Sequence, residues 1–176
     1  MKEQTIYHYQ LLYRFRWKLA GYLLQVVCLG GLLFGSTRVF PVHFEELFVS
    51  LSILALLPIL HIMFFRLYAY SVSTRPRLSP DMLFCPWWGA GTAYPATLGF
   101  FRAAETTVCL GSICVPAALF VWIPQSYAID FLAGGLVLAL PRIIGLIHSF
   151  RQPKHCRIKY ETRSIAFLLT EGYKKT

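Results

Sequence analysis

Residues 82–101, MLFCPWWGAGTAYPATLGFF, decide the topology of this chain, because no formal charge lies between Asp81 and Arg102. A helix of that length rises about 1.5 Å per residue and would cross the roughly 30 Å hydrocarbon core of a bilayer. However, two prolines, three glycines and the adjacent Trp87 and Trp88 interrupt the stretch. We therefore predict that it does not span the membrane. It is instead an interfacial elbow, a re-entrant hairpin or an exposed docking surface, with Trp87 and Trp88 as candidate docking or interfacial residues.

The composition of the whole chain is that of a multi-pass membrane protein. The chain has 176 residues, of which 56% are hydrophobic and only 14% are charged, and its mean hydropathy is +0.54. A soluble domain has about a quarter of its residues charged. Long uncharged runs here alternate with basic clusters, which is the pattern of transmembrane helices and their loops. We expect an integral protein of the plasma membrane.

The net charge of +9 has two interpretations. In a soluble protein it would indicate a nucleic-acid partner. Basic loops beside apolar spans are instead what membrane orientation and anionic headgroups require, and the sequence contains no DNA- or RNA-binding signature. We therefore predict an association with anionic lipid headgroups on the cytoplasmic side and none with nucleic acid. The five cysteines form no CxxC pair, so we expect neither a metal nor a cofactor.

Four charge-poor runs predict an all-α integral membrane fold, a bundle of four transmembrane helices within residues 19–150. The expected spans cover about residues 19–37, 47–65, 106–129 and 131–150. Cytoplasmic loop 66–105 separates the second span from the third. Before the bundle, residues 1–18 interleave aromatic and basic side chains, which is typical of a lead-in at the headgroup level. After it, residues 151–176 form a basic cytoplasmic tail.

One segment of the tail departs from the helical pattern. Ile158, Tyr160 and Thr162 alternate with charged residues, and a period of two is typical of a short strand with one apolar face. Because a single strand is not stable alone, this segment needs another strand or the membrane surface as its partner.

The distribution of basic residues favours four spans over five. With residues 82–101 outside the membrane, every Lys and Arg except Arg38 and Arg142 lies on the side of the N-terminus. If the stretch crossed the membrane, the two sides would hold similar numbers of basic residues. The positive-inside rule therefore predicts four spans with both termini in the cytoplasm.

Arg142 is the strongest candidate for a functional residue, because it is the one formal charge within the predicted spans. A charge at that depth costs about 3 kcal/mol on insertion scales and is usually paired or functional. Its expected partner is Glu105, at the cytoplasmic start of the third span. A snorkelling arginine with a purely structural partner is the alternative.

His61 and His148 lie near the cytoplasmic ends of the second and fourth spans. Histidines on separate helices can bind haem or a metal, but the sequence shows no supporting ligands, and we expect both to face the headgroups. Small residues that let helices approach closely occur in two pairs, Gly31 with Gly35 and Gly134 with Gly135.

The sequence contains no nucleophile–base pair, phosphate loop or paired-carboxylate motif. It favours a non-enzymatic structural or accessory subunit of a membrane complex, bound to a protein partner or to a second copy of itself. The first alternative is a small transporter or channel for an ion or small solute, with Arg142 and Glu105 as its polar site. The second alternative is a lipid-modifying membrane enzyme, because sites that act on lipids can lack recognisable motifs.

Overall fold

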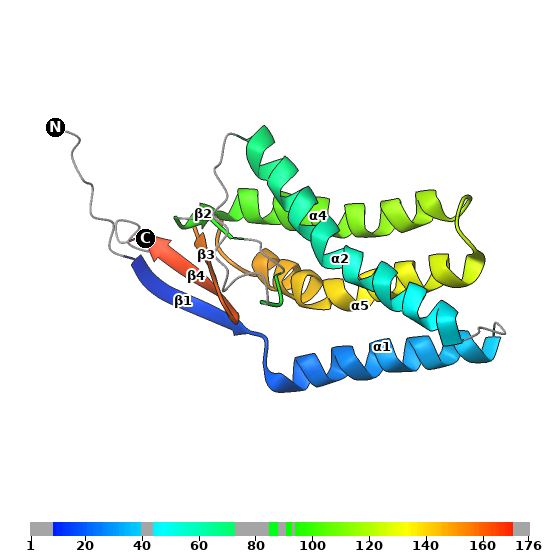
Figure 1. Cartoon of the computed structure of the whole chain (residues 1–176). Coiled ribbons are helices and arrows are strands. Elements are labelled where there is room, and N and C mark those ends of the chain that lie inside the picture. Colours follow the sequence, from blue (N-terminus) through cyan, green and yellow to red (C-terminus); the bar gives the residue numbers. More distant parts are fainter. Residues whose placement is uncertain (1–8, 40–43, 73–84, 88–90, 93, 171–176) are drawn as a thin grey trace.

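The computed structural model describes residues 9–39, 44–72, 85–87, 91–92 and 94–170. In these residues, long helices carry a small antiparallel sheet at one end (Figure 1). The helices are α1 (Leu19–Val39), α2 (Phe44–Ser71), α4 (Leu98–Leu119) and α5 (Gln125–Phe150). Each of the 4 contains a segment long and apolar enough to cross a membrane. The prediction of four transmembrane helices is therefore confirmed at the level of length and hydropathy.

The last two helices begin earlier than the charge-free runs predicted. The Thr97 side chain caps α4 by accepting a hydrogen bond from the backbone amide of Phe100 at 3.2 Å, so α4 begins well before residue 106. Helix α5 likewise begins before residue 131 and includes Asp130. The charges near the starts of these helices bond to partners within the protein, as described below. A charge-free run therefore underestimates the length of the helix.

The sheet corrects the prediction of an all-α fold. Its antiparallel strands, in the order β1-β4-β3-β2, are β1 (Tyr9–Arg16), β2 (Ala96–Thr97), β3 (Arg157–Glu161) and β4 (Ser164–Thr170). The strand expected in the tail is β3, and it pairs with β4 on one side and with β2 on the other. The sequence did not predict β1, because its aromatic and basic residues also match the pattern of a headgroup-level segment.

The pairing of β1 with β4 places both ends of the described chain at the same end of the bundle (Figure 1). Segments joined by a ladder of backbone hydrogen bonds lie on one side of a membrane, so an even number of spans separates them. The 4 candidate spans meet this condition, and the placement of residues 82–101 outside the membrane stays a prediction. The described residues of this stretch lie at the sheet end, where they contribute β2 and the first turn of α4. That this side is the cytoplasm stays a prediction.

The inner face of the sheet packs against the ends of the helices. Its large buried side chains are Phe15, Ile158, Tyr160, Ile165 and Phe167. Buried and exposed residues alternate along β3, whereas residues 164–167 of the central strand β4 are all buried. The large buried side chains form one apolar core with Phe65 of α2 and Phe101 of α4. A smaller apolar cluster lies farther along α2 and α5. The sheet and the bundle are thus packed as one unit.

Trp87 belongs to the core and not to an exposed surface. Its side chain has 0% exposure, and its ring centroid lies 5.9 Å from that of Phe15. Gly145 of α5 also lies against this ring, at 3.7 Å from the position that a Cβ would take. The expectation of a docking or interfacial surface is therefore corrected for Trp87, because β1 and α5 cover its ring. Trp88 lies outside the described residues.

The two glycine pairs have different surroundings. A Cβ at Gly134 would overlap a leucine side chain of α2, and one at Gly135 would lie 3.1 Å from the carbonyl oxygen of Ser112. At this pair, α5 approaches α2 and α4 closely. A Cβ at Gly31 or Gly35 would meet no described atom within 4 Å. Gly31 and Gly35 therefore pack against no other helix in the described part of the chain.

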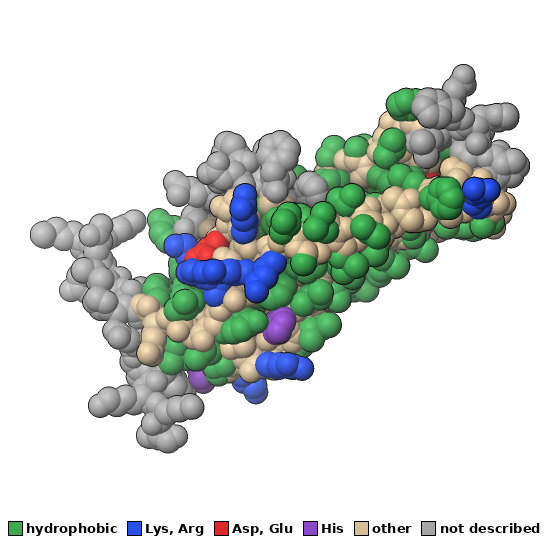
Figure 2. Space-filling view, turned by 90° about the horizontal axis from the view of Figure 1, so that it is seen from below, with side chains coloured by type: hydrophobic (Ala, Val, Ile, Leu, Met, Phe, Trp, Pro, Cys, Tyr) green, Lys and Arg blue, Asp and Glu red, His purple; other side chains and the backbone are tan. Residues whose placement is uncertain are grey.

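The surface seen in Figure 2 is charged at one end of the molecule and apolar along the helices. In this view, most Lys and Arg side chains gather over the sheet end, and hydrophobic side chains extend along the helices. Helix α1 is the most exposed helix, with only 6% of its apolar window buried. This distribution suits a bundle surrounded by lipid, because the lipid covers the apolar helix surface.

Candidate functional site

Glu105 and Arg142 form an ion pair in the interior of the protein. Glu105 lies near the start of α4, and Arg142 lies in the second half of α5. The guanidinium Nη1 donates to Oε2 of the carboxylate at 2.8 Å, and neither side chain has any exposed area. The structure thus brings together the two residues that the sequence indicated as charged partners.

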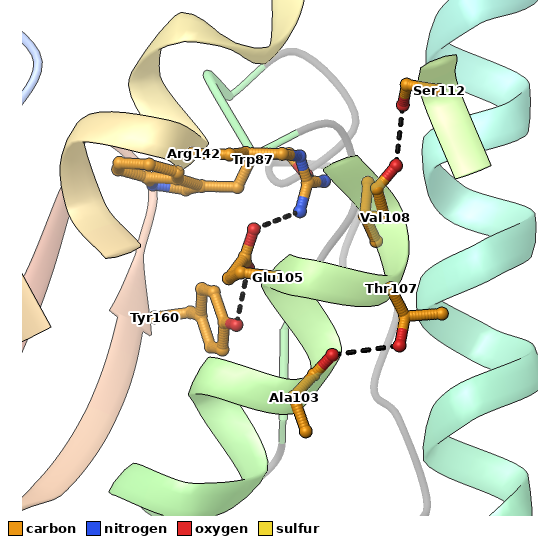
Figure 3. A network of polar contacts seen from close by, with 8 residues as sticks. All are labelled: Trp87, Ala103, Glu105, Thr107, Val108, Ser112, Arg142 and Tyr160. Atoms are coloured by element: carbon orange, nitrogen blue, oxygen red, sulfur yellow. Dashed lines mark hydrogen bonds and ion pairs between the residues drawn. The ribbon is translucent and has the colours of Figure 1, made fainter. Parts of the chain in front are cut away.

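Two further segments converge on this pair (Figure 3). Tyr160 of β3 donates its hydroxyl hydrogen to Oε1 of Glu105 at 2.7 Å, and Nη2 of Arg142 donates to the backbone carbonyl oxygen of Trp87. Burial and the neighbouring Glu105 carboxylate raise the pKa of Tyr160 well above its ordinary value. The phenol therefore stays protonated and acts as a donor. We call Glu105, Arg142, Tyr160 and the Trp87 carbonyl the sheet-end cluster.

The two buried charges of the sheet-end cluster pair with each other, while Nε of Arg142 has no hydrogen-bond partner among the described residues. Each carboxylate oxygen of Glu105 accepts a hydrogen bond, one from a cation and one from a hydroxyl group. Removing one partner of such a pair costs about 3–5 kcal/mol, because the other charge is left buried and unpaired. The cluster therefore joins α4, α5, β3 and the segment that precedes α4 into one unit.

A second contact between α4 and α5 lies closer to the helix ends. Arg102 donates through Nε to the hydroxyl oxygen of Ser149 at 3.2 Å and through Nη2 to its carbonyl oxygen at 2.6 Å. Its guanidinium also lies 4.8 Å from the centre of the Phe150 ring. A cation is favourable at the C-terminus of a helix, where the last carbonyl groups have no helical partner. The sequence indicated only that Arg102 ended an uncharged stretch.

Another buried polar cluster lies at the opposite end of the bundle, and the sequence did not predict it. Asp130 of α5 is 2% exposed, and its Oδ2 accepts hydrogen bonds from Ser50 of α2 at 2.8 Å and from Ser36 of α1 at 3.4 Å. Its Oδ1 has no hydrogen-bond partner among the described residues. We call these three residues the far-end cluster. The only sequence signal is a single acid between the charge-poor runs 106–129 and 131–150.

His61 and His148 have different environments. His61 of α2 is fully buried, and neither of its ring nitrogens has a hydrogen-bond partner in the described part of the chain. It does not face the headgroups as expected, because α2 packs against α4 and α5. The ring of His148 is half-buried, 5.5 Å from that of Tyr13 and 5.2 Å from that of Phe15. Within the described ranges, no group of three or more His, Cys, Asp or Glu residues suits a metal ion.

Gln25 of α1 is a further buried polar residue that the sequence did not indicate. Its Nε2 donates to the carbonyl oxygen of Val137 in α5 at 3.0 Å. Its Oε1 accepts a hydrogen bond from the indole nitrogen of Trp17 at 3.2 Å. This link connects α1 to α5 and to the end of β1, and hydrogen bonds of this kind stabilise helix contacts within a membrane.

A comparison of the chain with protein families, curated proteins and solved structures finds no match. The function is therefore inferred from the two polar clusters and from the surface around the sheet.

Proposed function

We propose that this chain is a non-enzymatic structural or accessory subunit of a membrane complex. The observation that supports this function best is the sheet-end cluster, whose buried bonds connect the sheet to α4 and α5. A sheet connected in this way keeps a fixed position relative to the helices. Such a surface suits a docking subunit, because little conformational entropy is lost in ordering it when a partner binds.

The docking surface that we propose is the edge strand β1. This strand is at one edge of the described sheet, and four of its large apolar side chains stay exposed, namely Tyr9 at 37%, Leu11 at 48%, Leu12 at 48% and Tyr13 at 38%. Edge strands pair readily with other chains and are normally shielded by charge, by a bulge or by cover. Exposed apolar residues on an edge favour a protein that pairs or packs along the strand.

We assign the sheet to the cytoplasmic face of the plasma membrane. The support is the distribution of basic residues, because every Lys and Arg of the described residues except Arg38 and Arg142 belongs to a segment at the sheet end, and cytoplasmic loops carry an excess of such residues. The partner is then a cytoplasmic protein or the cytoplasmic part of another membrane subunit.

The test is co-purification of the tagged full chain from its own membranes. Leu12→Lys places a charge on the apolar edge and should release a stoichiometric partner. Gln10→Lys is the matched control, because it adds the same charge to the same strand without removing an apolar side chain, and the partner should remain bound. Release by both variants, or by neither, would contradict the assignment to β1. If the parent chain has no stoichiometric partner, the accessory role is wrong.

The far-end cluster favours a second candidate function, a small transporter or channel for a proton or a cation. Asp130 has a buried carboxylate oxygen without a partner among the described residues, and ionisable groups inside a membrane often mark ion pathways. Glu105 and Arg142 support such a path less well, because they bond to each other. Cation or proton flux into liposomes that contain only this chain, lost in Asp130→Asn, would favour transport over the accessory role. Flux no greater than that of empty liposomes would exclude transport.

A further inference from the structure

We propose that a basic pocket beside β1 binds the phosphate group of an anionic phospholipid. The pocket has a volume of about 530 Å³ and is open to the surface. Its lining includes the cations Arg14, Arg16 and Lys18 and the rings of Tyr13, Phe15 and His148. The two buried clusters use none of these residues.

Two of the three cations are available for a ligand. Arg14 donates to the carboxylate of Glu161 at 3.2 Å. Across the described ranges, Arg16 and Lys18 have no carboxylate within ion-pair distance, and both are exposed. Among the described residues, no acidic side chain lines the pocket. A phosphate matches this charge, because its oxygens accept several charge-assisted hydrogen bonds from Lys and Arg.

The pocket lies where the apolar helices meet the charged end of the molecule. Lys18 directly precedes α1, and His148 lies in the last turn of α5. Both helices are candidate membrane spans, so the pocket is at the level of the lipid headgroups. Figure 2 shows the same boundary as a change from hydrophobic to basic side chains. Because anionic headgroups are concentrated at this level, the position favours a lipid over a soluble anion.

The walls of the pocket are formed before any ligand binds. Strand β1 pairs with β4 along its length. The rings of Tyr13 and Phe15 lie within 5.5 Å and 5.2 Å of the His148 ring, which packs the strand on the end of α5. A phosphate held by the two available cations would therefore bind at the junction of β1, α1 and α5 without reordering of the backbone.

The test measures how tightly the purified full chain binds phosphatidylglycerol in phosphatidylcholine nanodiscs, by native mass spectrometry. The test variant combines Arg16→Gln with Lys18→Gln. The matched control combines Arg157→Gln with Lys159→Gln, which removes the same charge from exposed residues of β3 that do not line the pocket. A third variant, Arg16→Lys with Lys18→Arg, keeps the charge and reports whether substitution itself damages the site.

We expect the test variant to bind phosphatidylglycerol about thirtyfold more weakly, because each of the two cations loses a direct ion pair with the phosphate, and such an exposed pair contributes up to about fivefold to affinity. The control and the charge-preserving variant should stay within about threefold of the parent chain. Equal losses of affinity in the test variant and the control would contradict a phosphate site in the pocket, since binding would then depend on net charge alone. An unchanged test variant would also overturn it. Displacement of the lipid by inorganic phosphate would assign the site to a soluble anion instead.

Discussion

The two buried polar clusters, at opposite ends of the bundle, differ in how their carboxylates are compensated. At the sheet end, Glu105 faces an arginine and a tyrosine hydroxyl, and both of its oxygens accept hydrogen bonds. At the far end, Asp130 faces two serine hydroxyls, and its Oδ1 has no partner in the described part of the chain. A buried carboxylate that is paired with a cation stabilises the folded structure. A buried carboxylate that accepts hydrogen bonds only from neutral hydroxyl groups can still bind a proton or a cation.

This difference agrees with the connectivity of the chain. At the sheet end, segments distant in the sequence meet, and directional bonds between charged groups fix how they fit together. At the far end, a short connection links α1 to α2, and another links α4 to α5. These connections already hold the helices of each pair close together. We therefore expect the sheet-end cluster to contribute more than the far-end cluster to the stability of the fold. In the proposed transport function, the far-end cluster is the part that would bind the ion.

The largest expected effect is that of Arg142→Leu, which leaves Glu105 buried without a cation. We expect the free energy of unfolding to fall by about 3–5 kcal/mol. Adding Glu105→Gln should restore part of the loss, because no charge is then buried. Reversible unfolding in lipid–detergent micelles gives the coupling energy through a double-mutant cycle. A coupling energy within error of zero would remove the basis of the comparison.

Tyr160→Phe should have an intermediate effect, because it removes only the hydroxyl group that joins β3 to Glu105. A hydrogen bond to a charged group contributes about 1.5–3 kcal/mol, and we expect the free energy of unfolding to fall by about that amount. Tyr13→Phe is the matched control, since it removes the hydroxyl of a tyrosine that is 38% exposed. It should change stability by less than about 0.5 kcal/mol. Equal losses in the same unfolding assay would show that the bond to Glu105 has no specific role.

Asp130→Asn should have the smallest effect on stability. The asparagine keeps an oxygen that can accept a hydrogen bond from Ser50, and it removes a charge that no described cation compensates. We therefore expect the free energy of unfolding to change by less than about 1 kcal/mol. If the loss equals that of Arg142→Leu in the same assay, the far-end carboxylate is structural and the two clusters do not differ in the way described above.

The helices and one of the two clusters were predictable from the sequence for the same physical reason. Lipid excludes unpaired charge, so uncharged runs mark the spans, and a single arginine in such a run must have a nearby partner. Arg142 and Glu105 satisfy that requirement. The far-end cluster was not predictable, because serine hydroxyls carry no charge signal and come from two helices other than that of Asp130.

The sheet shows where local patterns stop being informative. Residues 157–161 alternate between charged and apolar side chains, and this period of two identified β3. Strand β1 pairs with a strand at the other end of the chain, and no local pattern reports a pairing over that separation. The burial of Trp87 depends on the same pairing, because β1 provides the Phe15 ring that covers it.

The pairing of β1 with β4 is the central feature of the fold, because it creates the sheet and places both ends of the described chain at the same end of the bundle. Gln10 and Leu169 are opposite each other in this ladder. Cysteines at these two positions, in a chain whose five native cysteines are alanine, should form an intramolecular disulfide on oxidation in intact membranes. Cysteines at Gln10 and Leu168 should not, because neighbouring residues of a strand point to opposite faces. A missing disulfide in the first pair, or equal formation in both, would contradict the pairing of β1 with β4 and the common location of these two strands.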